Sequence, residues 1–309
     1  EILSGLVGSE MCIRDRVGDA VLSNAIAVAL GNDITLDAAL TVDTVGDLLA
    51  TGNISGTGGL TKTGAGILTL DGSNSYTGPL AVQAGALVAN TAAALGNAST
   101  VDVGAGALLS LTGGGLINSL GGAGNVDVGA GSTLQVGAGS FAGSLIGNGN
   151  LDKIGTGTLS LLGDNGVAGS TSVSGGTLDV AGSLTSSTLN VALGGTLRGA
   201  GAVTGPVTIA DGGRLAITSG STLSVGGLSL ASGAFIDASL AAPSATRLLA
   251  VNGNLTLDGT LNITDIGGFG TGVYRLMDYT GLLTNNALLL GTIPGLSLIH
   301  ISEPTRPER

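Results

Sequence analysis

The chain alternates short apolar segments with turns rich in glycine and asparagine. In residues 34–42 an apolar side chain occupies every second position, which is the period of a strand with one buried face. The apolar segments at 67–70, 80–83 and 86–88 are each followed or preceded by a glycine, asparagine or aspartate turn. Segments this short favour strands that stack on neighbouring coils over long hairpins. Helical spacing is also possible over 20–30, but that segment has no capping residue and no polar face.

A long internal repeat organises these segments. Residues 56–90 recur within 147–182 with a constant offset of 91 residues and no gap. A fixed self-match of this kind is typical of repeat architectures. The matching positions of the first copy are Gly56, Gly58, Leu60, Lys62, Gly64, Gly66, Leu68, Leu70, Gly72, Asn74, Gly78, Val82, Gly85 and Leu87.

Shorter self-matches give the length of one coil. The sequence VDVGAGALLSL at 101–111 returns as VDVGAGSTLQV at 126–136. The glycine pair that begins at Gly194 returns at Gly212. Offsets of about 18–25 residues, as in these two matches, suit one coil of a β-solenoid, because each coil then holds about three short strands. We therefore predict an all-β fold, a parallel β-helix (β-solenoid) of about 13–14 coils at ~20 residues per coil over residues 17–296.

Stacking explains the composition of such a chain. A single coil cannot bury its apolar face alone, so coils stack about 4.8 Å apart and their strands pair in parallel. Glycine, at 58 residues, allows sharp bends and positive φ angles. If Gly66 holds φ > 0, Gly66→Val is expected to destabilise its coil by about 1 kcal/mol or more.

Residues 241–296 differ from the rest and predict a more compact closing section. They contain two of the three tyrosines and Met277. We interpret Tyr274, Met277 and Tyr279 as packing residues of the core or of a cap, in preference to a ligand site.

The two ends do not match the middle. Residues 17–296 contain no Glu, Cys or His, and the single Cys12 and His300 lie outside them. The strings SEMCIRDR and SLIHISEPTRPER resemble translated sequencing adapters. We predict that 1–16 and 297–309 are non-native tails, and that the chain is an internal fragment whose signal peptide is not present.

Charge and hydropathy exclude several classes of function. The formal net charge of −11 leaves no basic patch for a phosphate backbone, so nucleic acid is not a predicted partner. No run approaches the ~18–20 apolar residues of a membrane helix. Aspartates stand singly at turns, which indicates turn chemistry and solubility. Examples are Asp71, Asp164, Asp211 and Asp258.

No motif predicts catalysis. A Ser-His-Asp or Cys-His site needs a histidine, and His300 lies in the predicted tail. There is no His/Cys cluster for zinc, no phosphate-binding loop and no complete dinucleotide fingerprint. We predict no enzyme activity, no cofactor, and no catalytic, cofactor-binding or metal residues.

Lys62 and Lys153 occupy the same position of the two long repeats. They allow two interpretations: a charge for binding, or a coil-edge lysine whose stem packs while its ammonium stays in water. The sequence favours the second interpretation.

The segment 59–78, GLTKTGAGILTLDGSNSYTG, resembles the autotransporter-associated β-strand repeat, whose pattern is similar to GLTKxGxGTLTLsGxNtYtG. The second copy keeps Leu151 and Lys153 but has Val167 where the first copy has Tyr76. The resemblance implies a passenger domain of the type V secreted proteins of Gram-negative bacteria, and hence a right-handed parallel β-helix. It implies that 17–240 is the β-helical passenger and that 241–296 is its end, ahead of a barrel that is missing from this sequence.

The resemblance also implies partners and a location. The partners would be the protein's own C-terminal outer-membrane barrel and host glycans or surface proteins. The location would be the cell surface or outer membrane, or the protein would be secreted. Three functions stay open: a structural stalk, a β-helical carbohydrate-active enzyme with aspartates on one face, and adhesion through the long faces of the solenoid.

Overall fold

A computed structural model describes residues 2–3 and 19–294. The regular secondary structure of these residues consists of strands, and no helix occurs among them. The chain divides into two compact units: the first runs to Asp152 and includes Gly163–Gly169, and the second comprises Lys153–Leu162 and the residues from Ser170 onward. The predicted tails lie outside the described residues, except for Ile2–Leu3, so they stay a prediction.

The strands are short in both units. The first unit contains β1 Ile2–Leu3, β2 Ala20–Asn24, β3 Val28–Leu30, β4 Ile34–Leu36, β5 Leu40–Thr44, β6 Leu48–Ala50, β7 Ile54–Gly56, β8 Leu60–Thr63, β9 Ile67–Leu70, β10 Leu80–Val82, β11 Ala86–Ala89, β12 Val101–Val103, β13 Leu108–Leu111, β14 Gly115–Gly122, β15 Asn125–Val128, β16 Thr133–Phe141, β17 Ser144–Gly147 and β20 Asp164–Gly166, and β18 Asn150–Lys153 ends at the unit boundary. The second unit contains β19 Thr158–Leu161, β21 Thr171–Val173, β22 Gly176–Val180, β23 Ser183–Thr185, β24 Leu189–Val191, β25 Gly195–Gly199, β26 Ala202–Ile209, β27 Arg214–Thr218, β28 Leu223–Leu230, β29 Phe235–Leu240, β30 Leu249–Val251, β31 Leu255–Leu257, β32 Thr260–Asp265, β33 Met277–Tyr279, β34 Leu283–Asn285 and β35 Leu289–Leu290.

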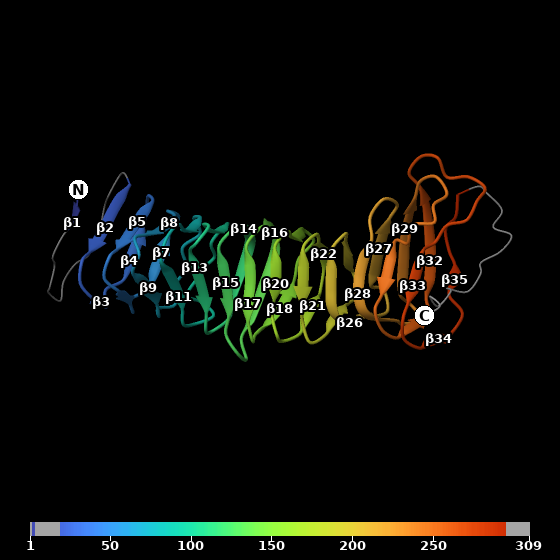
Figure 1. The fold of residues 1–309 in the computed structure, drawn as a ribbon. Helices are drawn as coiled ribbons and strands as arrows, with labels where there is room; N and C mark the ends of the chain where they lie inside the picture. Colours follow the sequence, from blue (N-terminus) through green and yellow to red (C-terminus); the bar gives the residue numbers. More distant parts are fainter. Residues whose placement is uncertain (1, 4–18, 295–309) are drawn as a thin grey trace. The chain divides into compact units, whose positions relative to one another are not determined.

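The first unit is a stack of parallel coils. One face consists of β2, β5, β8, β10, β12, β14 and β16, and a second consists of β3, β6, β9, β11, β13, β15 and β17. A third face begins with the parallel pair of β4 and β7. Figure 1 shows these strands stacked in chain order. On the second face, Leu48, Leu68, Leu87 and Leu109 lie in register and are all buried, so they form an aliphatic column inside the coils.

The second unit has the same plan. Its first face is β22, β25, β27, β29, β32 and β35, joined at the start by β19. Strand β26 turns a corner, because its beginning pairs with β23 and its end with β24. Strand β28 does the same with β30 and β31. Leu184, Val203, Val225 and Val251 form a buried column that continues to Tyr279.

The predicted β-solenoid is confirmed, with about 11 turns where 13–14 were predicted. The coil length explains the difference. The partner of Thr177 in the next coil is Thr196, but the partner of Phe235 is Thr260 and the partner of Thr260 is Leu289, so the step along the chain becomes longer. Coils that grow toward the end of the described residues reduce the number that fit.

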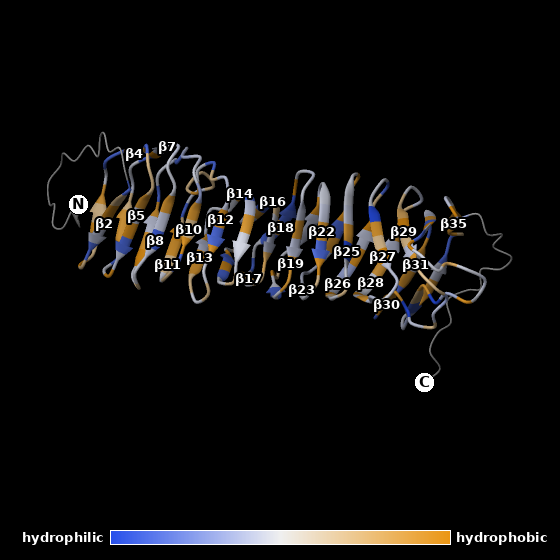
Figure 2. Cartoon of the chain, turned by 90° about the horizontal axis from the view of Figure 1, so that it is seen from above, coloured by the Kyte–Doolittle hydropathy of each residue, from blue (hydrophilic) through white to orange (hydrophobic). Residues whose placement is uncertain are grey.

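Alternation was correct, but some predicted boundaries were wrong. The single strand expected over 34–42 is two strands, β4 and β5, separated by a turn at 37–39. Leu36 and Leu40 are both buried, because each turns inward from a different face. The helical alternative over 20–30, which the sequence did not favour, does not occur, since β2 and β3 occupy that segment. Figure 2 shows hydrophobic and hydrophilic positions within the same strands, as expected where only one side faces the core.

The sequence repeat is also a repeat of backbone conformation. Three glycines of the first copy have positive φ, and their counterparts in the second copy have nearly the same angles. These are Gly56, Gly64 and Gly85 at 103°, 73° and 64°, and Gly147, Gly155 and Gly176 at 102°, 67° and 62°. Gly66 is not among the glycines with positive φ, so the premise of its predicted role is wrong. A Cβ there would lie 2.6 Å from the carbonyl oxygen of Gly46, so the coil below requires glycine for close approach instead.

The aromatic residues near the end of the second unit pack as predicted. Met277 and Tyr279 are buried in β33. The hydroxyl of Tyr274 donates to the carbonyl oxygen of Gly270, 3.1 Å away, and its ring lies 5.0 Å from that of Phe269. Whether 241–296 forms a domain section of its own stays a prediction.

Candidate functional site

Lys62 is fully buried at 0% exposure in β8. Its Nζ donates to the carbonyl oxygens of Thr63, Gly64 and Ala84 at 2.7, 2.9 and 3.1 Å. Burial lowers the pKa of Lys62 below its ordinary value, and the carboxylate of Asp43 opposes part of that shift. We call this arrangement, one ammonium held by three backbone carbonyls, a lysine clasp.

Lys153 forms the second lysine clasp, and it is likewise 0% exposed. Its Nζ donates to the carbonyl oxygens of Ile154, Gly155 and Gly175 at 2.6, 3.4 and 3.1 Å, and each acceptor is the repeat counterpart of one in the first clasp. The prediction of a solvated ammonium is therefore wrong for both lysines. The physical reason is that the positive-φ glycine turn points its carbonyls inward, within reach of the lysine just before it.

Buried asparagines also connect coils. Asn74 is 7% exposed, its Oδ1 accepts from the backbone N–H of Ile54 at 2.7 Å and its Nδ2 donates to the carbonyl of Ala94 at 2.6 Å. It thus bonds to the coil before and the coil after its own. In the second repeat, the Oδ1 of Asn165 accepts from Leu145 at 3.0 Å. The sequence predicts an asparagine in a turn at this position, and the signal for its role between coils is that Asn74 recurs as Asn165 in the second repeat.

Tyr76 is the largest fully buried side chain in the described residues. Its hydroxyl has no hydrogen-bond partner among them. Burial raises the pKa of Tyr76 above its ordinary value, because the interior disfavours the phenolate. Gly96 lies against the ring of Tyr76, and a Cβ at Gly96 would lie only 3.0 Å from a ring carbon. The absence of a side chain at Gly96 therefore leaves space for the tyrosine ring.

Turn aspartates accept hydrogen bonds from the backbone, as turn chemistry predicts. Asp47 Oδ1 accepts from the N–H of Ile67 at 3.0 Å, and Asp211 Oδ1 accepts from Gly233 at 2.8 Å. Both acceptors therefore reach the next coil. Asp258 Oδ1 instead accepts from the N–H of Gly259 beside it, at 2.8 Å.

Two ion pairs on the second unit join one arginine to one aspartate. Arg198 lies 3.0 Å from Asp179, and Arg214 lies 2.7 Å from Asp237. The guanidinium of Arg214 also stacks 4.4 Å above the ring of Phe235. Such half-exposed pairs contribute little to stability, and each leaves no net charge.

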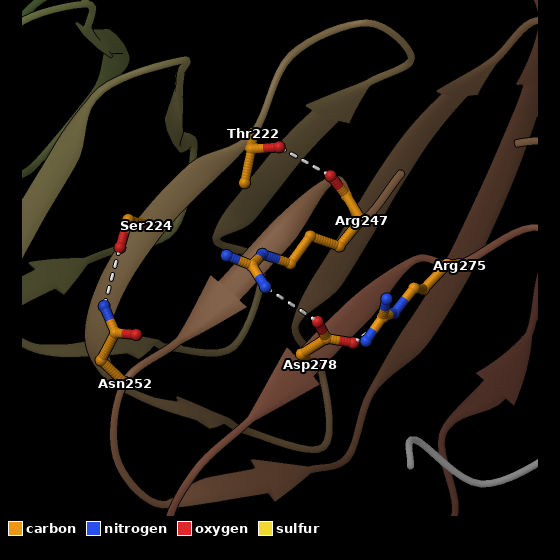
Figure 3. Close-up of polar contacts among 6 residues, drawn as sticks. All are labelled: Thr222, Ser224, Arg247, Asn252, Arg275 and Asp278. Carbon is orange, nitrogen blue, oxygen red and sulfur yellow. Dashed lines mark hydrogen bonds and ion pairs between the residues drawn. The ribbon is translucent and has the colours of Figure 1, made fainter. Parts of the chain in front are cut away.

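Asp278 in β33 is different, because two arginines share it. Arg247 Nη1 lies 3.2 Å from Oδ2, and Arg275 Nε lies 2.7 Å from Oδ1. Figure 3 shows the two guanidinium groups approaching the carboxylate from opposite sides. The side chain of Asp278 is 6% exposed, while those of Arg247 and Arg275 are 49% and 43% exposed. We call Arg247 and Arg275 the arginine pair.

A surface hollow of about 530 Å³ lies in the first unit. Its lining is uncharged and consists of Ala92, Thr112, Gly113, Gly115, Leu116, Ala130, Gly131, Ser132, Thr133 and Gln135. The carbohydrate-active enzyme considered from the sequence needs two carboxylates that converge in a groove. The hollow contains none, and residues 2–3 and 19–294 hold no group of three His, Cys, Asp or Glu that could bind a metal. That alternative is not supported.

The same residues contain no helix with the length and apolar character needed to cross a membrane.

Comparison with known proteins agrees with the repeat geometry. Residues 60–89 and 151–180 match the passenger-associated transport repeat, the two segments that carry the lysine clasps. These two segments are therefore similar to the repeat of autotransporter passenger domains. A curated relative, the adhesin BmaC autotransporter of Brucella suis biovar 1 (strain 1330), is 43% identical over 94 residues. That region is 29% of this chain and 2% of the relative, so the chain matches a small part of that protein. No solved structure matches the chain.

Proposed function

We propose that this chain is a surface-exposed or secreted β-solenoid scaffold, and that it serves adhesion through its outer faces. The observation that carries the proposal is that both passenger repeats direct their lysine inward to backbone carbonyls. The repeat chemistry therefore stabilises coils and offers no reactive group to a substrate.

Two further findings support adhesion. The relative is named an adhesin and an autotransporter. The outer positions of the coils carry hydroxyl, amide and carboxylate groups such as Thr35, Ser55, Asp127 and Asn190, which suit polar contacts with a glycan or a protein surface. The proposal includes export in linkage to an outer-membrane barrel of the same protein, and an absence of catalysis.

The test is antibody access to the protein on intact cells. Antibodies are raised against the purified chain and applied to the producing bacterium, with and without permeabilisation of the outer membrane. The proposal expects binding to intact cells or antigen in the medium, and loss of adhesion to host cells or glycan-coated surfaces when the gene is deleted. Antibodies against a periplasmic protein are the control for leakage. Antigen that becomes accessible only after permeabilisation would overturn the proposal.

A further inference from the structure

We propose that the arginine pair of the second unit is a binding site for the acidic group of a sugar, a carboxylate or a sulfate. The inference rests on the proposed adhesive function and gives it a ligand class and a location. The site lies on the outside of the coils, where β30 and β33 run in parallel and Ala250 is the register partner of Asp278.

The local charge is the first argument. Two guanidinium groups share one carboxylate, so the arrangement carries a net positive charge of one unit by formal count. The whole chain has a formal net charge of −11, and the other two arginines in the described residues, Arg198 and Arg214, each have an aspartate of their own. An anion that approaches this acidic surface is therefore attracted at the arginine pair and repelled over most of the remainder.

The available donors are the second argument. The ion pairs engage Nη1 of Arg247 and Nε of Arg275. A guanidinium has five N–H donors, and nearly half of each side chain is exposed, so both arginines retain donors that face solvent. The planar fork of arginine matches the geometry of carboxylate and sulfate oxygens and binds them in bidentate fashion.

Preorganisation is the third argument. Asp278 is buried and holds both guanidinium groups, so a ligand does not have to order two long side chains. The backbone also fixes the arginines: the Oγ1 of Thr222 donates to the carbonyl of Arg247 at 2.7 Å, and the N–H of Arg275 donates to the carbonyl of Ser244 at 3.2 Å. Figure 3 shows the first of these contacts beside the ion pairs.

The surroundings suit a sugar ring. Asn252 Nδ2 donates to Ser224 Oγ at 2.8 Å, and this amide–hydroxyl pair appears with the arginine pair in the same view of Figure 3. Amide and hydroxyl groups bond the hydroxyls of a sugar. Tyr274, the neighbour of Arg275 in the chain, packs its ring 5.0 Å from that of Phe269.

The experiment measures binding of the purified chain to three immobilised polysaccharides by surface plasmon resonance. Polysialic acid presents carboxylates, heparin presents mainly sulfates and dextran is neutral. At an ionic strength of about 0.15 M the chain is expected to bind one or both acidic polymers and not dextran. Arg247→Gln and Arg275→Gln are each expected to weaken binding and so raise the Kd by about tenfold or more. Binding to polysialic acid alone assigns the ligand a carboxylate, and binding to heparin alone assigns it a sulfate.

Arg198→Gln is the matched control, because Arg198 belongs to the same unit and is 51% exposed but has an aspartate of its own. It is expected to bind like the wild type. Three results would each contradict the proposed site. They are equal weakening of binding by Arg247→Gln, Arg275→Gln and Arg198→Gln, binding of the chain to dextran as strong as to the acidic polymers, or no binding to either acidic polymer. Thermal melts of each variant, with Arg247→Lys as a charge-preserving substitution, separate loss of binding from loss of fold. Antibody access on intact cells does not depend on these residues, so failure of the site and failure of the proposed function give different results.

Discussion

Tyr76 places a phenolic hydroxyl in the aliphatic interior of the first unit without a partner among the described residues. An unsatisfied buried hydroxyl costs about 1–3 kcal/mol, so Tyr76→Phe is expected to raise the free energy of unfolding by about 1 kcal/mol. Urea unfolding followed by circular dichroism gives the value. Tyr274→Phe is the control, because its hydroxyl accepts from the N–H of Gly270 at 2.9 Å and donates to a carbonyl, so this variant should lose stability. Equal destabilisation of both variants would contradict the assignment.

The same tyrosine gives an alkaline limit to stability. Its pKa is raised in the folded state, so above pH ~10, the ordinary tyrosine value, the unfolded chain releases the proton first. Ionisation then favours unfolding, and stability is lost as the pH rises past about 10. The stability difference between wild type and Tyr76→Phe should be constant to about pH 9 and widen above it. The lowered pKa of Lys62 acts in the opposite direction, with stability rising toward pH ~10.5, but it is present in both proteins and cancels in the difference. A constant difference up to pH ~11 would refute the prediction.

The lysine clasps predict that substitution of Lys62 or Lys153 lowers the free energy of unfolding, which substitution of a surface lysine would hardly change. Lys62→Met and Lys153→Met each remove an ammonium from three carbonyl acceptors, and each is expected to lower the free energy of unfolding by about 1–3 kcal/mol. A solvated lysine would change it by less than about 0.5 kcal/mol. Chemical denaturation of the two variants beside Arg198→Met, at a half-exposed position, makes the comparison. If the two lysine variants lose no more unfolding free energy than Arg198→Met, the lysines behave as solvated surface lysines and the clasps do not stabilise the fold.

At the scale of the single coil, glycine sets how closely two turns approach. Gly66 is expected to tolerate no larger side chain, since a Cβ there meets the Gly46 carbonyl at 2.6 Å. Gly66→Val should lower the thermal midpoint and cost more than about 1 kcal/mol. Gly166→Val is the matched control, because nothing lies within 4 Å of a Cβ at that position, and it should stay within about 0.5 kcal/mol of wild type. Similar melting curves for the two variants would show that the coils separate without cost.

The coils could be predicted from the sequence because the offsets between its internal self-matches give the coil length. Leu68 and Leu87 are register partners in successive coils, and both fall in predicted strands. The direction of a polar side chain could not be predicted in the same way. Lys62 lies two residues after the buried Leu60, on the same side of β8, where a lysine can either pack inside or extend its ammonium to water. The inward carbonyls of its own turn and of the next coil hold the ammonium inside.

The arginine pair could not be predicted for a different reason. Arg247 and Asp278 are 31 residues apart, which exceeds the coil length indicated by the offsets between the short self-matches. The longer coils of that region are set by exposed segments such as 242–247, whose lengths follow no repeat.

At the scale of the whole molecule, a constant register makes coils removable. Deleting residues 60–79 joins Gly59 to Leu80 and removes one coil, so Leu80 should pair with Leu40 as Leu60 does in the intact chain. The shortened protein is expected to keep its β circular dichroism and cooperative unfolding, with a smaller urea m-value because less surface is exposed. Deleting only 70–79 shifts the register by half a coil and should abolish cooperative unfolding. Equal behaviour of the two deletions would argue against a stacked register.

The enclosed lysines also determine where the folded chain can be cleaved. In the described residues of the first unit, Lys62 is the one target for a protease that cuts after lysine or arginine, and it is fully buried. The accessible targets in the described residues are the arginines of the second unit, of which Arg247 follows the exposed segment 242–246. Trypsin-like digestive and serum proteases should therefore leave the described coils of the first unit whole, while a cut after Arg247 would place Arg247 and Arg275 on different fragments of the chain.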